Sequence, residues 1–361
     1  MSTADTEIKI GKRICKNRIT MAPTVKFNAG EDGIVTDFFV KHYELRAKHG
    51  VGFICVEATA VAPEGRLAPS QIGLWNDEQI EGHRRLVDAC HAFGTIIVPQ
   101  IHFGGLSTHP KCGRLTSPTS VKWNLFGNEV DAHELTFAEI KEIEGRFIDA
   151  AVRAQKAGYD GVQLHGCHSY LINDFASAVN KRTDEYGGST ENRARFGCNI
   201  ISGIRKACGD DFIISVRTTG CDPTVEESLG IAECYVKAGC DYLQVSTGIQ
   251  DIDFIEHDDS LPYNKIAALG VKFHDHFKGI VPVSLVNGIR TPEQVHYVLE
   301  NDLIDTVDLA CGLLADPAFS EAILNGTPYE KCYSCKTCGW GPDHAHICPA
   351  LAKRGDEEWV W

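Results

Sequence analysis

The sequence lacks any apolar run that approaches the roughly 18 residues of a membrane span. Its first residues, Met-Ser-Thr-Ala-Asp-Thr-Glu, contain neither a basic start nor an apolar segment, so we expect a cytoplasmic protein without a secretion signal. Positive charge is also scarce, because 35 lysines and arginines stand against 49 aspartates and glutamates, for a formal net charge of −14. This excess of negative charge disfavours binding to nucleic acid and to anionic membranes. These absences favour a protein that acts on a small-molecule substrate.

The sequence also lacks a Gly-x-Gly-x-x-Gly run, so no dinucleotide-binding domain of the Rossmann type is expected. No linker, low-complexity segment or short-period repeat is visible. With 361 residues, of which 43% are hydrophobic, the chain is long enough to bury one large core. An α/β barrel of this length can be a single domain.

Eight short runs rich in β-branched residues alternate with helical stretches. They are residues 18–21, 52–56, 95–100, 161–164, 212–216, 242–245, 281–286 and 306–309. This alternation predicts an α/β protein, a (β/α)8 TIM barrel over residues 1–328, followed by a short cysteine-rich extension over residues 329–361. A long excursion at residues 104–131 follows the third strand, and we expect it to cover the active site.

Helix starts are visible at two places. Thr136 followed by Glu139 predicts a capping box, and Thr291-Pro292-Glu293 predicts the start of another helix. Both helices should lie outside the barrel. The chemistry of such a barrel lies at the C-terminal ends of its strands.

Two imidazoles and a phenol come at the end of the fourth expected strand, in the segment His165-Gly-Cys-His168-Ser-Tyr170. Imidazoles can donate to a developing negative oxygen and a tyrosine hydroxyl can deliver a proton, so this trio suits chemistry at a polarised carbonyl compound. Considered alone, a His-x-x-His pair is more often a structural pair or half of a metal site. The flanking residues decide between these interpretations.

The segment resembles the old yellow enzyme family of FMN-dependent NADH:flavin oxidoreductases. In that family a His-x-x-His-x-Tyr-Leu run precedes an Asn-x-Arg-x-Asp-x-Tyr-Gly-Gly-Ser-x-Glu-Asn-Arg stretch, as residues 165–171 and 180–193 do here. The resemblance covers nearly the whole chain from about Ile10 onward. It is closest to the branch of 2,4-dienoyl-CoA reductase and trimethylamine dehydrogenase, here without the C-terminal nucleotide-binding domains.

The resemblance implies an FMN site with ten contact residues, namely Ala22, Pro23, Thr24, Ala58, Gln100, Arg217, Asn287, Gly288, Ala310 and Cys311. In the family, the glutamine that corresponds to Gln100 binds the pyrimidine part of the flavin ring. The arginine that corresponds to Arg217 stabilises the reduced, anionic flavin near N1. A fixed cation there favours the reduced ring, although a salt bridge at a strand end is the alternative role for Arg217. Asn287 and Gly288 belong to the first of two phosphate loops.

The chain departs from the family pattern at two positions. Cys311 stands where the family usually has an arginine in the second phosphate loop. Losing that arginine removes a charge-assisted contact of about 1.5–3 kcal/mol, so FMN should bind more weakly or use another cation. Val25 replaces a threonine or cysteine that tunes the flavin potential.

Carried over residue by residue, the motif implies that His165 and His168 hold the carbonyl oxygen of the substrate and that Tyr170 supplies the proton. The implied reaction is hydride transfer from FMN to the β-carbon of an enoate, enone or enoyl thioester, with NAD(P)H as a direct or indirect electron donor. Trimethylamine dehydrogenase has a tyrosine at the position of His165. The histidine therefore favours ene reduction over amine oxidation.

The tail contains a C-x2-C-x2-C-x9-C array made of Cys332, Cys335, Cys338 and Cys348. Four thiolates can ligate an iron–sulfur cluster or a zinc ion, and disulfides are disfavoured in a cytosolic protein. The resemblance favours a [4Fe-4S] cluster. His344 and His346 are rival ligands.

Three functions stay open at this point. The first is an ene-reductase, the second an amine dehydrogenase, and the third a barrel that has lost FMN and serves as a structural or electron-transfer subunit. A cluster beside a flavin implies single-electron exchange with a separate electron-transfer protein or subunit. We also expect a homo-oligomer.

Overall fold

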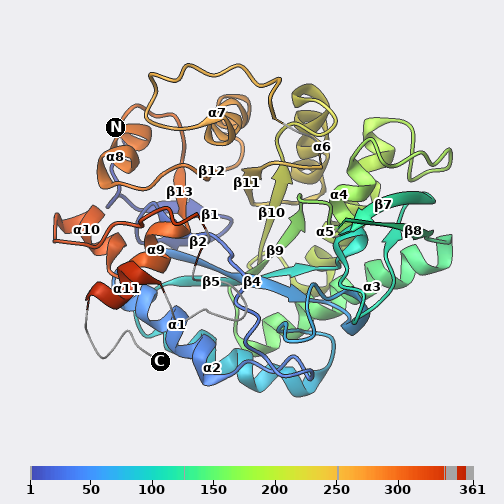
Figure 1. Ribbon diagram of the computed structural model, residues 1–361, viewed down its shortest axis with the longest axis horizontal. Coiled ribbons are helices and arrows are strands. Elements are labelled where there is room, and N and C mark those ends of the chain that lie inside the picture. Colours follow the sequence, from blue (N-terminus) through green and yellow to red (C-terminus); the bar gives the residue numbers. More distant parts are fainter. Residues whose placement is uncertain (1, 126, 250–251, 337, 339–347, 355–361) are drawn as a thin grey trace.

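The computed structural model describes residues 2–125, 127–249, 252–336, 338 and 348–354. Its centre is a closed barrel of eight parallel strands (Figure 1). In chain order these are β3 (Ile19–Met21), β4 (Phe53–Ala60), β5 (Ile96–His102), β9 (Gly161–Gly166), β10 (Ile213–Thr219), β11 (Tyr242–Ser246), β12 (Val283–Val286) and β13 (Thr306–Leu309). Each predicted run overlaps one of these strands. The predicted α/β barrel is therefore confirmed.

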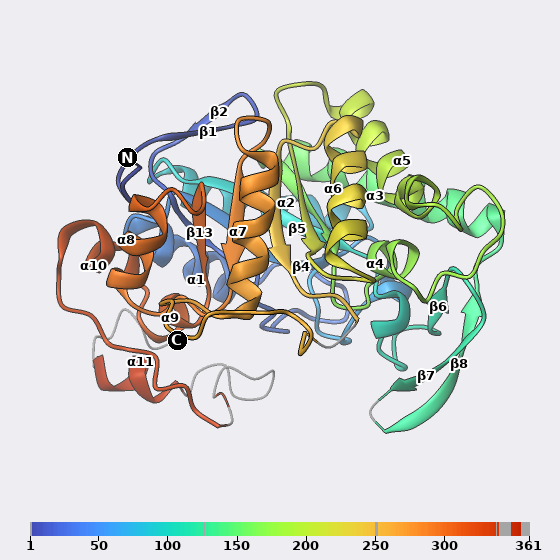
Figure 2. The same ribbon diagram turned by 90° about the horizontal axis from the view of Figure 1, so that it is seen from above.

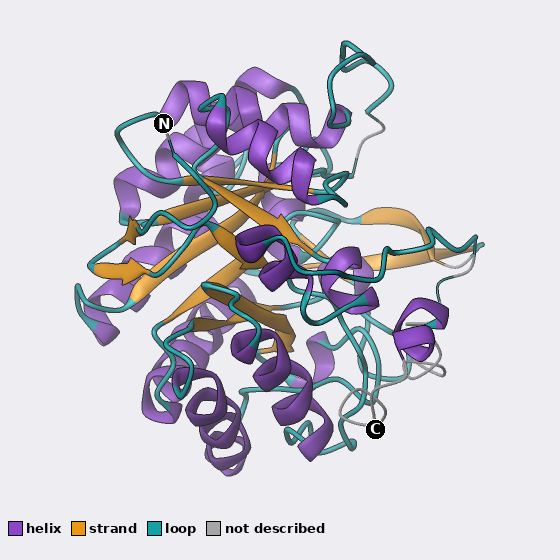
Figure 3. Cartoon of the chain, turned by 90° about the vertical axis from the view of Figure 1, so that its left-hand side faces the viewer, coloured by secondary structure: helices purple, strands orange, loops and turns teal. Residues whose placement is uncertain are grey.

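Helices surround the strands on the outside, as Figure 3 shows. They are α1 (Asp37–Lys48), α2 (Ile80–His91), α3 (Phe137–Ala157), α5 (Thr190–Cys208), α6 (Val225–Ala238), α7 (Lys265–Phe277) and α8 (Pro292–Glu300). Both predicted starts are confirmed: Thr136 and Glu139 form the capping box of α3, and Thr291 and Gln294 form that of α8. Among the described helices, none is both long and apolar enough to cross a membrane.

The N-terminal end of the barrel is covered by an antiparallel hairpin of β1 (Ile8–Ile10) and β2 (Arg13–Cys15). Its apolar side chains form one buried cluster with residues at the N-terminal ends of four barrel strands. The cluster consists of Ile8, Ile10, Cys15, Phe53, Cys55, Ile96, Val98, Ile213 and Tyr242. Burying these side chains removes apolar surface from water and stabilises the closed end. The C-terminal end of the barrel is not covered by this hairpin, and the candidate active site lies there.

The excursion after β5 contains the short turn η3 (Gly105–Ser107) and a small sheet of β6 (Thr116–Ser117), β7 (Val121–Leu125) and β8 (Asn128–Glu134). Figure 2 shows β7 and β8 extending away from the barrel beside α4 (Leu171–Ala176). The expectation that residues 104–131 cover the site was wrong for the described residues of this segment, because none of them lines the strand-end cavities described below. Apolar contacts hold this sheet against Leu106 and Val179 instead.

The C-terminal part returns to the end of β13. It contains three helices, α9 (Cys311–Ala315), α10 (Phe319–Asn325) and α11 (Pro349–Arg354). Two short 3-10 helices, η1 (Pro63–Gly65) and η2 (Asp77–Gln79), lie much earlier in the chain, between β4 and α2. Leu314 and Ala318 pack against Cys348 and Leu351, so α11 lies beside α9 (Figure 1). The rival ligands His344 and His346 lie outside the described residues.

Candidate active site

The ends of neighbouring parallel strands bring the predicted residues together. β9 and β10 pair His165 with Arg217, and β5 and β9 pair Gln100 with Gln163. The Nε2 atom of Gln100 donates to Oε1 of Gln163 at 2.8 Å. Residues paired across parallel strands sit at the same height in the barrel, so the imidazole and the guanidinium emerge side by side at its C-terminal end.

Two adjoining cavities open at this end, with volumes of about 590 and 780 Å³. The first, the loop cavity, is lined by Ala22, Pro23, Thr24, Arg217, Val286, Asn287, Gly288, Ile289, Arg290, Asp308, Ala310 and Cys311. The second, the ring cavity, is lined by Pro23, Thr24, Val25, Lys26, Ala58, Gln100, His165, His168, Tyr170, Arg217, Leu314 and Cys338. Together they contain all ten predicted flavin contacts and all three predicted catalytic residues.

Arg217 lines both cavities and is only 9% exposed. Its Nη2 donates to Ser246 Oγ at 3.3 Å, whereas its buried Nε has no hydrogen-bond partner among the described residues. Within the described part of the chain no carboxylate forms an ion pair with Arg217, so the alternative role as a salt bridge is not supported. An unsatisfied, buried guanidinium fits an anionic group in the cavity, because an unpaired buried charge is costly.

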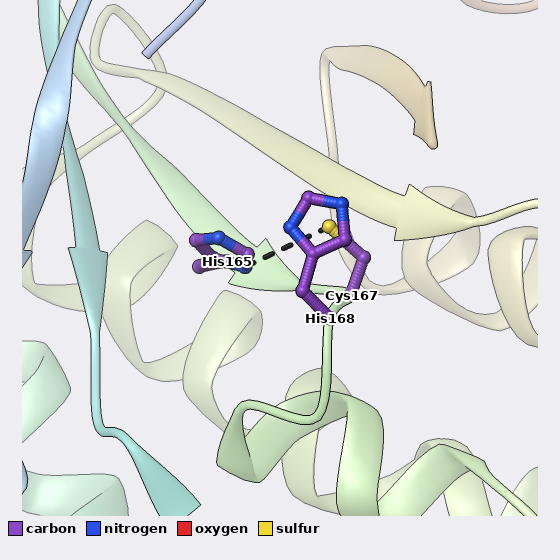
Figure 4. A group of neighbouring side chains, drawn as sticks. All are labelled: His165, Cys167 and His168. Atoms are coloured by element: carbon purple, nitrogen blue, oxygen red, sulfur yellow. Dashed lines mark hydrogen bonds between the residues drawn. The ribbon is translucent and has the colours of Figure 1, made fainter. Parts of the chain in front are cut away.

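The three residues predicted to be catalytic form a compact group. The ring centroids of His165 and His168 are 5.3 Å apart, and those of His165 and Tyr170 are 3.9 Å apart. His168 and Ser169 both have φ near 59°, a left-handed conformation that turns the chain sharply after β9. The turn brings the second imidazole back beside the first (Figure 4). Nε2 of His168 lies 2.9 Å from Ser246 Oγ.

Burial sets the protonation of the trio. It lowers the pKa of His165 well below the usual value, and burial together with the charge of Arg217 lowers the pKa of His168 to about 3. Burial raises the pKa of Tyr170 well above its usual value. At neutral pH both imidazoles are therefore uncharged, with one N–H each, and the phenol keeps its proton. The cavity is thus lined by neutral groups that can donate hydrogen bonds to an oxygen.

A third imidazole, His102, was missed by the sequence reasoning. It ends β5, and its ring centroid lies 5.3 Å from that of Tyr170. The amide nitrogen of Gln71 donates to its Nε2 at 2.8 Å, so the hydrogen sits on Nδ1, which has no partner among the described residues. Side chains two residues apart on a strand lie on the same face of the sheet. The spacing between Gln100 and His102 was therefore the sequence signal that could have identified His102.

A buried cation also lies in the ring cavity. Lys26 Nζ donates to the carbonyl oxygen and to Oγ1 of Thr24 at 2.6 and 2.8 Å. Its backbone N–H donates to Glu57 Oε2 at 2.8 Å. Burial lowers the pKa of Lys26 and raises the pKa of Glu57, and the attraction between the two charges opposes both shifts. No motif in the sequence pointed to this pair.

Among the described residues, one group of three histidine, cysteine or carboxylate side chains has its ligand atoms within 4.8 Å of one another: His165, Cys167 and His168 (Figure 4). Sγ of Cys167 lies 3.7 Å from Nδ1 of His165. No metal was expected here. The two imidazoles belong to the predicted oxyanion-binding set.

The four predicted tail ligands, Cys332, Cys335, Cys338 and Cys348, line a third cavity of about 650 Å³ together with Cys311. Within the described residues, no three of these thiols have their sulfur atoms within 4.8 Å of one another. Leu314 and Cys338 also line the ring cavity, so the cysteine cavity adjoins it.

Comparison with known proteins agrees with this arrangement. Residues 6–330 match the model of the NADH:flavin oxidoreductase / NADH oxidase family. The chain is 36% identical to an NADH oxidase of Thermoanaerobacter brockii over 91% of its own length and 52% of the relative's, so it spans about half of that protein. It is 34% identical to an NADPH dehydrogenase of Clostridium acetobutylicum, covering 90% of this chain and 97% of the relative.

Among solved structures, the fold matches a 2-naphthoyl-CoA reductase in complex with 2-naphthoyl-CoA with a TM-score of 0.85. The sequence identity is 25%, and the match covers 99% of this chain and 58% of that one. The family match spans the whole barrel, including every residue of the loop cavity and every residue of the ring cavity except Cys338. The chain therefore belongs to the NADH:flavin oxidoreductase / NADH oxidase family, the oxidoreductase family that its motifs indicated.

Proposed function

We propose that this protein is an FMN-dependent ene-reductase that reduces an α,β-unsaturated carbonyl compound. One observation carries the proposal: two uncharged imidazoles and a protonated phenol line the same cavity as the residues expected to hold the flavin ring. Donors of this kind suit a carbonyl oxygen that gains negative charge during reduction. A substrate that gains no such charge would not need them.

The roles of the residues follow from this arrangement. A bound FMN, reduced by NAD(P)H, supplies the hydride that adds to the β-carbon of the substrate. His165 and His168 donate to the carbonyl oxygen and stabilise its developing charge. Tyr170, beside His165, delivers the proton to the α-carbon. Ser246 holds Nε2 of His168, which orients the ring toward the oxygen through its other nitrogen.

FMN itself is accommodated by the two cavities. Gln100 and Ala58 lie at the ring end, and Asn287, Gly288, Ala310 and Cys311 lie at the loop end where the phosphate is expected. Arg217 stands between them with its Nε unsatisfied, a suitable partner for the reduced, anionic ring. Ala22, Pro23 and Thr24 are proposed to pack against the flavin.

The substrate is proposed to be an enoate, enone or enoyl thioester. The ring cavity opens to solvent, which gives an acyl group a route to the residues that line it. The structural similarity to a protein crystallised with 2-naphthoyl-CoA supports the thioester among these classes.

We further propose that Cys332, Cys335, Cys338 and Cys348 hold a [4Fe-4S] cluster. They line one cavity, Cys338 also lines the ring cavity, and four thiolates in such an array can ligate a cluster. A cluster held there would supply single-electron exchange with a separate electron-transfer protein. The homo-oligomer and the cytoplasmic location stay predictions, which light scattering and cell fractionation would test.

Anaerobic purification, followed by flavin, iron, sulfide and zinc assays on one sample, tests the cofactors. One FMN and about four irons per chain are expected. Titrating the reduced protein with an enoate, an enone and an enoyl-CoA then tests the reaction, because a substrate reoxidises the flavin. Reduction of the oxidised flavin by methylated amines would instead show an amine dehydrogenase. Absence of flavin binding would show a barrel that has lost FMN.

A further inference from the structure

The loop cavity contains a cation that the family pattern does not assign to it. Arg290 lies on the loop between β12 and α8, two residues after Gly288, and lines this cavity with Asn287 and Cys311. The sequence pattern had left the phosphate of FMN without its usual arginine, because Cys311 stands at that position. A phosphate needs charge-assisted donors more than any other part of the cofactor.

Arg290 and Cys311 border the same space, because both line the loop cavity and the neighbouring cysteine cavity. The positive charge of Arg290 lowers the pKa of the Cys311 thiol, opposing the increase that burial causes. Arg290 therefore brings a positive charge to the cavity that a side chain at position 311 also lines.

The backbone of Arg290 is held firmly. Its N–H donates to Oε1 of Gln294 at 2.7 Å, and Nε2 of Gln294 donates to the carbonyl oxygen of Pro262 at 2.8 Å. The guanidinium donates from Nη1 to Ser334 Oγ. In the described part of the chain no carboxylate lies within ion-pair distance of Arg290. The charge is thus positioned without an internal counter-ion.

We propose that Arg290 binds the phosphate of FMN and replaces the arginine missing at position 311. The guanidinium offers several N–H donors in one plane and can pair two of them with phosphate oxygens. This inference rests on the proposed use of FMN and names the residue that secures the phosphate end. It also predicts discrimination between FMN and riboflavin, which lacks the phosphate.

The test compares the affinities of FMN and riboflavin for protein freed of flavin, measured by quenching of flavin fluorescence. In Arg290→Gln we expect the dissociation constant of FMN to rise about 10- to 100-fold, because one charge-assisted contact is lost. The riboflavin constant should change little. Arg290→Lys keeps the charge without the planar guanidinium, so its dissociation constant for FMN should lie between those of the wild type and Arg290→Gln. Arg84→Gln on the outer helix α2 is the control and should match the wild type.

A second variant tests the shared position directly. Adding Cys311→Arg to Arg290→Gln should restore much of the affinity for FMN, since an arginine returns to the same cavity. A double variant as weak as Arg290→Gln would contradict the equivalence of the two positions. Wild-type affinity for FMN in Arg290→Gln would overturn the inference and leave the proposed function intact. Failure of the wild type to bind either flavin would instead overturn the proposed function.

Discussion

The imidazole of His165 and the phenol of Tyr170 lie with their ring centroids 3.9 Å apart, although one residue belongs to strand β9 and the other precedes helix α4. In the proposed reaction, this contact places the hydrogen-bond donor for the carbonyl oxygen beside the proton donor for the α-carbon. In an α,β-unsaturated carbonyl compound those two atoms are separated by one bonded carbon. The two proposed roles can be tested separately.

Replacing Tyr170 with phenylalanine should slow only the half-reaction in which the substrate reoxidises the flavin. A lost general acid costs about 10²- to 10⁴-fold, whereas reduction by NAD(P)H does not need this proton. The fold should be kept, because the Tyr170 hydroxyl bonds no other described residue. Anaerobic stopped-flow absorbance separates the two half-reactions. Equal slowing of both would show that Tyr170 is not the acid.

Replacing Arg217 with glutamine should make the flavin harder to reduce. The variant loses the fixed charge that stabilises the reduced, anionic ring, which we expect to lower the midpoint potential by about 30–60 mV for a two-electron couple. Arg217→Lys retains the charge and should shift the potential less. Spectroscopic titration with a redox dye measures both. An unchanged potential in Arg217→Gln would place the guanidinium away from the ring.

Replacing Cys338 with serine should remove most of the iron and sulfide and leave FMN in place. Serine is a poorer ligand for a cluster than a thiolate, and Cys338 is not one of the residues proposed to hold FMN. The matched control is Cys198→Ser on helix α5, which should keep wild-type iron. Iron, sulfide and flavin assays report the outcome. Zinc in the wild type at one per chain would exclude the cluster.

Replacing His83 with asparagine should make stability less sensitive to acid. Burial lowers the pKa of His83 to about 4, so the folded protein keeps this imidazole neutral. The unfolded chain takes up the proton below about pH 6.5, and stability is therefore lost as pH falls from about 6.5 to 4. Between pH 7 and 5 the wild type should lose about 2 kcal/mol more than the variant. Urea unfolding at both values measures this, and equal losses would contradict a neutral buried His83.

Much of the barrel was predictable from local pattern. The eight strands follow from short β-branched runs between helical stretches, and the capping residues Thr136 and Thr291 mark helix starts, because these signals depend on neighbours in sequence. The placement of His165, Gln100 and Arg217 at strand ends also followed from the pattern. The hairpin of β1 and β2 did not, since two strands of three residues carry too little periodicity to stand out.

The sequence by itself determined the family, the barrel and the chemical character of the site, because residue types and their order carry the motifs. Only the tertiary structure decided which side chains share a cavity. His102 comes beside Tyr170, Cys338 lines the ring cavity, and Arg290 lines the same cavity as Cys311. Such contacts depend on strand register and on the packing of the tail against α9, and both are set by burial over the whole molecule rather than by local sequence.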